Sequence, residues 1–87
     1  MSDRPIIEYP LLYPFKVMGY THGLRAHVKA LFEATLSVEL REEDVQEVAS
    51  RTGKYTSLTV QVWLENEEQR HRMYAVLHAD VRVTYYL

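Results

Sequence analysis

Apolar and polar residues alternate along several stretches of the chain, and this alternation predicts four β-strands. The clearest strand covers 57–64, where four apolar residues share one face: Leu58, Val60, Val62 and Leu64. The same period of two predicts strands over 14–20 and 81–87. The segment 40–50 follows the alternation least well, and we expect it to form an edge strand.

A helical period separates the first two strands. Between residues 22 and 37 the inward positions fall three or four apart and are Leu24, Val28, Leu31 and Thr35. Thr21 is suited to cap the N-terminus of this helix, and Lys29 and Glu33 are spaced to pair on its outer face.

A second helix is predicted between the last two strands. Asn66 and Gln69 have the spacing of a capping box, and Asp80 marks the end of the helix. A turn over 51–54 precedes the clearest strand, and Gly53 supplies the positive φ that a tight hairpin requires.

The predicted element order is β-α-β-β-α-β. With right-handed crossovers this order gives a ferredoxin-like α+β sandwich, in which a four-stranded antiparallel sheet carries two helices on one face. We expect a single domain over 14–87, preceded by a partly flexible lead-in over 1–13.

The other sheet face is then free of helices. Strand parity places Met18, Trp63 and Tyr86 on this open face. One interpretation is that large amphipathic side chains simply form strands well, and the other is that they contact a second subunit or partner. The lead-in offers a third possibility, because it has apolar residues that would cover the face by folding back: Ile6, Ile7, Leu11 and Leu12.

Composition narrows the function classes. The chain has 87 residues, 47% of them hydrophobic, a net charge of −2 and no cysteine. The absence of cysteine excludes disulfides and thiol catalysis, and the charge provides no global attraction to a polyanion. The N-terminus lacks the pattern of a signal peptide, so we expect a cytoplasmic protein that binds neither membrane nor nucleic acid.

Two activities known for this topology fit the residues poorly. An RNA reader needs stacking aromatics where the chain has Ser57 and Thr59. An acylphosphatase needs an arginine where the chain has His27, together with a hairpin asparagine, whereas Asn66 is the only asparagine. The histidines lack metal-ligand spacing and no nucleophilic triad can be assembled, so we expect no enzyme activity and no cofactor.

The most suggestive polar cluster is at the hairpin. Arg51 and Lys54 occupy its tip beside Ser50, Tyr55 and Ser57. These residues are either solubilising turn residues or a basic finger that docks an acidic partner or a ligand carboxylate.

Two segments carry a family resemblance. The first combines Glu8, Tyr9 and Pro10 with the sequence PFKVMG at 14–19, and the second consists of Ser50, Gly53, Tyr55 and 57–60. Over 7–87 the chain resembles the YbeD-like family of small bacterial proteins of unknown function. The family fold is similar to the ACT regulatory domain, and this similarity implies a metabolite site at the glycine turn 19–23.

The sequence therefore favours a non-catalytic regulatory or adaptor domain that binds an unidentified protein, with a homodimer included, through the open face and hairpin tip. The alternative is an ACT-like sensor that binds a small metabolite at the turn 19–23. The candidate surface comprises Lys16, Met18, Gly19, Gly23, Ser50, Arg51, Gly53, Lys54, Tyr55, Ser57, Trp63 and Tyr86.

Overall fold

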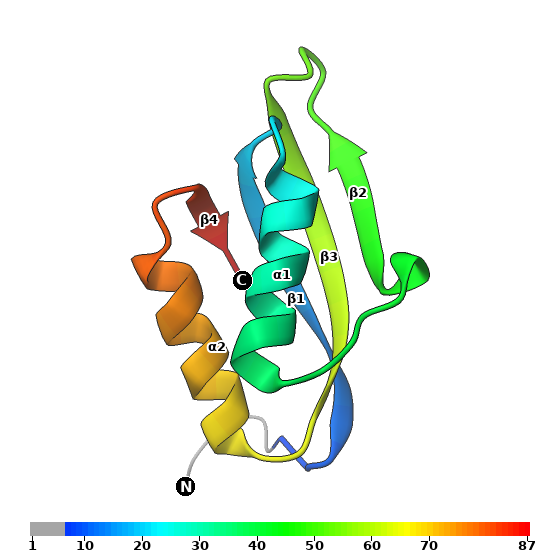
Figure 1. Cartoon of the computed structure of the whole chain (residues 1–87), viewed down its shortest axis with the longest axis vertical. Helices are drawn as coiled ribbons and strands as arrows, with labels where there is room; N and C mark the ends of the chain where they lie inside the picture. Colours follow the sequence, from blue (N-terminus) through cyan, green and yellow to red (C-terminus); the bar gives the residue numbers. More distant parts are fainter. Residues whose placement is uncertain (1–6) are drawn as a thin grey trace, which may run out of the picture.

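Seven elements follow one another in the computed structural model, which describes residues 7–87. In chain order they are β1 (Leu11–Tyr20), α1 (Leu24–Leu36), the 3₁₀ turn η1 (Glu42–Asp44), β2 (Val45–Ala49), β3 (Tyr55–Leu64), α2 (Glu67–Ala79) and β4 (Val83–Tyr86). The strands form one antiparallel sheet in the order β2-β3-β1-β4. Both helices lie on the same face of this sheet (Figure 1). The predicted ferredoxin-like architecture is confirmed.

The central pair of strands is longer than predicted. β1 begins at Leu11, three residues before Pro14, and pairs with β3 over ten positions from Leu11–Leu64 to Tyr20–Tyr55. The backbones of Lys16 and Leu87 exchange hydrogen bonds of 2.8 and 2.9 Å across the other edge of β1. Pro14 is two residues from Lys16, so the nitrogen of Pro14 points toward the same edge of β1 as the nitrogen of Lys16. The position of Pro14 lies beyond the end of β4, so the missing N–H of proline removes no hydrogen bond between strands.

One hydrophobic core lies between the sheet and the helices. The face of β3 that alternation predicted is buried there, opposite buried residues of both helices. The core consists of Phe15, Val17, Leu24, Val28, Phe32, Leu36, Leu40, Val45, Leu58, Val60, Val62, Leu64, Met73 and Leu77. Thr56 is the buried polar residue of the described chain, and its hydroxyl shares a 2.9 Å hydrogen bond with that of Thr21.

The beginning of α1 differs from the prediction. Gly23, with φ of 66°, is the N-cap residue, and no side chain caps this helix end. Thr21 was expected to be the cap, but its hydroxyl is engaged by Thr56. The turn before the helix bends through a left-handed residue, which glycine adopts without steric cost. The predicted cap was therefore wrong by two residues.

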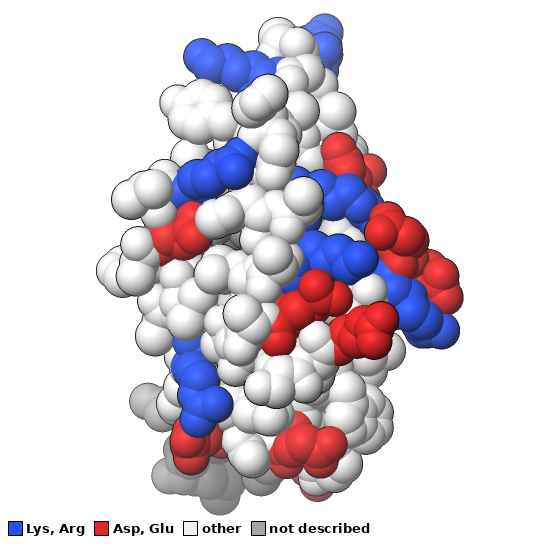
Figure 2. All heavy atoms as spheres, viewed as in Figure 1, with Lys and Arg blue, Asp and Glu red and all other residues white. Residues whose placement is uncertain are grey.

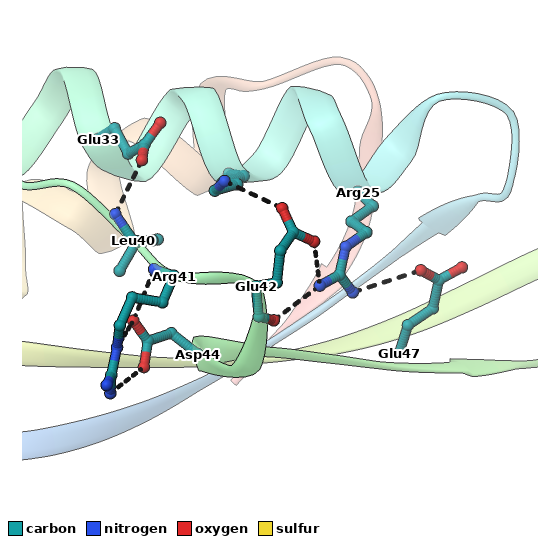
Figure 3. A network of polar contacts seen from close by, with 8 residues as sticks. Arg25, Glu33, Leu40, Arg41, Glu42, Asp44 and Glu47 are labelled. Atoms are coloured by element: carbon teal, nitrogen blue, oxygen red, sulfur yellow. Dashed lines mark hydrogen bonds and ion pairs between the residues drawn. The ribbon is translucent and has the colours of Figure 1, made fainter.

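The charged face of α1 also pairs differently from the prediction. Glu33 accepts a 2.8 Å hydrogen bond from the backbone nitrogen of Leu40, while Lys29 contacts Glu42 at 3.3 Å. Arg25 likewise contacts Glu42, at 3.2 Å, so that η1 is tied to the helix (Figure 3). The predicted pair within the helix was wrong because both partners have tertiary contacts, which helical spacing cannot reveal.

β2 is confirmed as an edge strand, although it covers only Val45–Ala49 of the predicted segment 40–50. The capping of α2 is also confirmed. Asn66 Oδ1 accepts a 2.9 Å hydrogen bond from the Gln69 nitrogen, while Gln69 Oε1 accepts from the nitrogen of Glu65.

The described part of the lead-in contacts the helices. The Tyr9 hydroxyl donates to Glu67 at 3.0 Å and accepts from Arg70 at 3.1 Å. Leu11 packs against the core, whereas Leu12 lies on the open face and is 56% exposed. The described segment therefore leaves the open face uncovered, and Ile6 lies outside the described residues.

The predicted face was wrong for the last two residues of β4, Tyr85 and Tyr86, whereas Val83 packs against the core. β1 and β4 pair as Val17–Tyr86 and Met18–Tyr85, but the register shifts at Gly19, which pairs with Val83. This bulge reverses the parity predicted from strict alternation. Tyr86 therefore packs against the core on the helix side.

The structure assigns the open-face position in β4 to Tyr85. Its side chain is 56% exposed beside Met18. Val81, the first residue of the predicted strand 81–87, precedes β4 and is 97% exposed.

Candidate functional site

A row of side chains crosses all four strands on the open face. Val48 pairs with Ser57, Ser57 with Met18, and Met18 with Tyr85. Adjacent strands are about 4.8 Å apart, so the row extends over about 15 Å. Leu87 flanks the row opposite Lys16. We call Met18, Val48, Ser57, Tyr85 and Leu87 the Met18 patch.

The Met18 patch is exposed and largely apolar. Val48 is 69% exposed, Leu87 57% and Met18 38%. Contiguous apolar side chains on a protein surface mark an interaction site more often than isolated ones do.

Two hollows adjoin in the patch because Ser57 is small. One, of about 140 Å³, lies between Met18 and Val48, and the other, of about 190 Å³, lies between Met18 and Tyr85. Ser57 lines both hollows. Each volume suits an apolar side chain better than a complete metabolite, because ligand pockets are typically larger.

The hairpin tip adds aromatic and basic groups beside the patch. Tyr20 and Tyr55 stack with ring centroids 4.9 Å apart, and Lys54 Nζ lies 5.9 and 5.6 Å from these centroids. The neighbouring Tyr20 hydroxyl raises the pKa of Tyr55 above its ordinary value. Arg51 is exposed in the same turn, where Gly53 has φ of 76° as predicted.

Charge is distributed unequally between the two sheet faces. Among the residues of the four strands, only Lys16 and Glu47 have side chains that are charged at neutral pH. Lys16 is on the open face, while Glu47 contacts Arg25 of α1 at 3.5 Å. On the helix side, acidic and basic side chains are interspersed (Figure 2). The open face of the strands therefore carries a positive charge and no carboxylate.

The glycine turn 19–23 is packed against Arg82. The Arg82 guanidinium donates a hydrogen bond to the carbonyl oxygen of His22 and lies beside Gly23. A Cβ atom on Gly19 would overlap the carbonyl oxygen of Arg82 and lie 3.0 Å from Leu24. Packing therefore requires glycine at position 19, whereas Gly23 is favoured by its positive φ of 66°.

The carboxylate of Asp80 holds Arg82, which packs against this turn. Asp80 accepts hydrogen bonds from His27 Nε2 at 2.7 Å and from the Arg82 nitrogen at 2.9 Å. Burial alone would raise the pKa of Asp80, but these hydrogen bonds outweigh it and hold the pKa below its ordinary value. The contacts connect α1 to the loop before β4.

The structure thus divides the predicted surface. It brings Lys16, Met18, Ser50, Tyr55 and Ser57 together, with the hairpin tip adjoining them. Trp63 lies at the opposite end of the same face, paired with Leu12 and 50% exposed. Tyr86 is on the other face, where its hydroxyl is 3.1 Å from His78 Nδ1.

The Met18 patch includes three residues that the prediction omitted. The sequence indicates an open-face position only weakly for Val48 and Leu87. Val48 lies in the segment 40–50, where alternation is poor, and Leu87 lies at the end of the last predicted strand. Nothing in the sequence indicates that Tyr85 faces outward, because the bulge that turns it outward does not change the alternation of apolar and polar residues.

Residues 7–87 show neither a metal-binding cluster nor a membrane-spanning helix. No three histidine, aspartate or glutamate side chains of this part of the chain are close enough together to hold a metal ion. None of its helices has the length and apolar character needed to cross a membrane.

Comparison with known proteins gives the family. The model of DUF493, described as a protein of unknown function, matches residues 4–87. The chain belongs to this family. It is 37% identical to the UPF0250 protein NMC1112 of Neisseria meningitidis, covering 94% of this chain and 92% of the relative. It is 30% identical to the UPF0250 protein NE1487 of Nitrosomonas europaea, covering 97% of each.

A solved structure agrees with the fold. The solution structure of protein HP0495 from H. pylori has a TM-score of 0.78 and 24% identity, covering 99% of this chain and 90% of the other. The resemblance to small bacterial proteins of unknown function is thus confirmed for this DUF493 member, and no catalytic activity is indicated for the family.

Proposed function

We propose that this DUF493 protein is a non-enzymatic docking domain that binds another protein through the Met18 patch. The observation that carries the proposal is the apolar row across all four strands, with two adjoining hollows over Ser57. Side chains of a partner would enter these hollows and remove Met18, Val48 and Tyr85 from water.

The energetics support an interface of moderate strength. Burying exposed apolar surface yields about 25 cal/mol per Å², and a filled hollow adds close packing. A large side chain exposed by half, such as Tyr85 or Leu87, still has substantial area to bury. Because association also costs translational and rotational freedom, a patch of this size suits reversible binding.

Rigidity also favours docking here. Met18 and Ser57 lie on the two central strands, which pair over ten residues and whose reverse face is buried behind the patch. A rigid surface loses little conformational entropy when it binds. A partner would therefore meet a preformed surface.

The test is an affinity capture with the full chain and two matched variants. Ser57→Ile fills both hollows, whereas Thr59→Ile makes a similar change on the same strand and face one row away. Both isoleucines retain strand preference. We expect captured proteins to be retained by wild type and Thr59→Ile and lost from Ser57→Ile, with both variants folded by circular dichroism.

Two outcomes would refute the proposal. One is a set of captured proteins that is the same for wild type and Ser57→Ile. The other is failure to capture any protein above the level of a bead control, including after chemical cross-linking.

A further inference from the structure

We propose that the partner segment at the Met18 patch is an acidic amphipathic peptide, in which carboxylates flank two apolar anchors. The inference rests on the proposed docking function and adds the chemistry of the partner. It follows from the charges around the patch and from the arrangement of its hollows.

Three basic side chains lie around the Met18 patch. Lys16 lines the hollow beside Tyr85, and Lys54 and Arg51 belong to the hairpin tip next to the other hollow. Glu47, the acidic residue of the strands, is held by Arg25 on the helix side. A partner that places carboxylates beside its apolar anchors would therefore meet complementary charge without a repulsive group in the strands.

These cations are available for a partner. The ion pairs of the described residues engage Arg25, Lys29, Arg41, Arg70 and Arg72. Ion pairing within residues 7–87 leaves Lys16, Arg51, Lys54 and Arg82 without a carboxylate, and of these Arg82 is engaged by the carbonyl oxygen of His22. Three unpaired cations around one apolar patch distinguish it from the helix side, where charges are interspersed (Figure 2).

The same charges disfavour a second copy as the occupant. Lys16 pairs with Thr59 in the row of side chains next to the one that contains Met18 and Ser57, near the middle of the open face. Two copies packed face to face around a two-fold axis there would bring their Lys16 side chains together. Like charges at the centre of an interface oppose binding, so a different, acidic chain fits better.

The hollows define the anchors. One lies over β2 and β3 and the other over β1 and β4, on either side of Met18. With strands about 4.8 Å apart, the two anchors would be about 5 to 10 Å from each other. Residues i and i+3, or i and i+4, of one helix face meet this spacing. A short amphipathic segment therefore suffices as the probe.

The experiment is a selection of random dodecapeptides displayed on phage against the full chain. We expect enriched peptides to combine aromatic or aliphatic residues with Asp and Glu. Each exposed ion pair contributes a factor of about 1.4 to 5 in affinity. The triple variant Lys16→Gln, Arg51→Gln and Lys54→Gln should therefore bind a selected synthetic peptide about 3- to 100-fold more weakly.

Controls separate this inference from the docking function. Arg72→Gln removes a cation of the helix side, where it pairs with Glu68, and should leave peptide affinity unchanged. One outcome would overturn the inference and leave the docking function intact: the selected peptides fail to bind Ser57→Ile, but they are not enriched in Asp and Glu, and they bind the triple variant as tightly as wild type. Peptides indifferent to Ser57→Ile would contradict the docking function itself.

The oligomeric state provides a further test. Sedimentation at micromolar concentration should show a monomer. A wild-type dimer that dissociates in Ser57→Ile would identify a second copy as the occupant and overturn the inference of an acidic partner.

Discussion

Alanine at position 19 tests whether the glycine turn is required by packing. In β1, Gly19 pairs with Val83 at the bulge, and the carbonyl oxygen of Arg82 lies over its α-carbon. A methyl group there would overlap that oxygen and crowd Leu24 at 3.0 Å. Because the overlapping atom belongs to the backbone, it cannot move aside by rotating a side chain. β4 must shift or separate from β1.

The cost follows from this geometry. Overpacking a well-packed site costs about 1 to 3 kcal/mol, a large fraction of the 5 to 15 kcal/mol that typically stabilises a domain. For a chain of 87 residues, each kcal/mol lowers the melting temperature by about 4 to 8 °C. Gly19→Ala should therefore melt about 5 to 20 °C below wild type in calorimetry. Amide exchange should accelerate in β4 before it does in β3.

A control at Gly53 separates steric overlap from backbone conformation. A Cβ on Gly53 would contact nothing within 4 Å, but its φ is 76°. Gly53→Ala should cost about 1 kcal/mol, and Gly53→Asn less, because asparagine tolerates the left-handed region. If Gly19→Ala melted like wild type, or if adding Arg82→Ala restored its stability, the overlap with the Arg82 backbone would be refuted.

Three further expectations concern stability. The depressed pKa of Asp80 means that its carboxylate stabilises the fold above the unfolded-state pKa of about 4, and that this contribution is lost as pH falls through the folded pKa. Urea unfolding of Asp80→Ala should thus respond less to acidification than wild type; equal responses would contradict this. Tyr86→Ser should destabilise by about 1 to 3 kcal/mol because Tyr86 packs on Tyr74, while Tyr85→Ser should stay within about 0.5 kcal/mol; the reverse order would contradict the bulge. Val60→Asp should abolish cooperative thermal unfolding, because it buries an unpaired charge; a wild-type melt would place Val60 outside the core.

The sequence predicted those parts of the fold that local rules determine. Strict alternation identified the buried face of β3, and the pair Asn66 and Gln69 identified the beginning of α2. Each signal concerns neighbours in the chain, so no tertiary information was needed. The element order then selected the architecture, because few topologies satisfy the handedness rule.

The errors arose where tertiary contacts override a local pattern. Thr21 has the chemistry of a helix cap, but Thr56 binds its hydroxyl. Alternation assigned Tyr86 to the open face, but one bulge next to Gly19 reversed the parity of the end of β4, at Tyr85 and Tyr86. The candidate surface inherited this error, since Tyr85 replaces Tyr86 beside Met18. A bulge depends on both paired strands and is not visible in either one alone.

The edges of the sheet provide a separate reason to look to its face for binding. Strand addition needs a free row of backbone donors and acceptors, and proteins protect such edges with short strands, prolines and charges. β2 is only five residues long and carries Glu47, while the uncovered edge of β1 includes Pro14, which has no N–H to offer. β4, the other edge strand, has only four residues. These edges therefore disfavour a long added strand, which supports the proposal that binding uses side chains of the open face. In the docking function that we propose, the Met18 patch supplies these side chains. Specificity would then depend on the shape over Ser57 and on the charge of Lys16, two properties that single substitutions can separate.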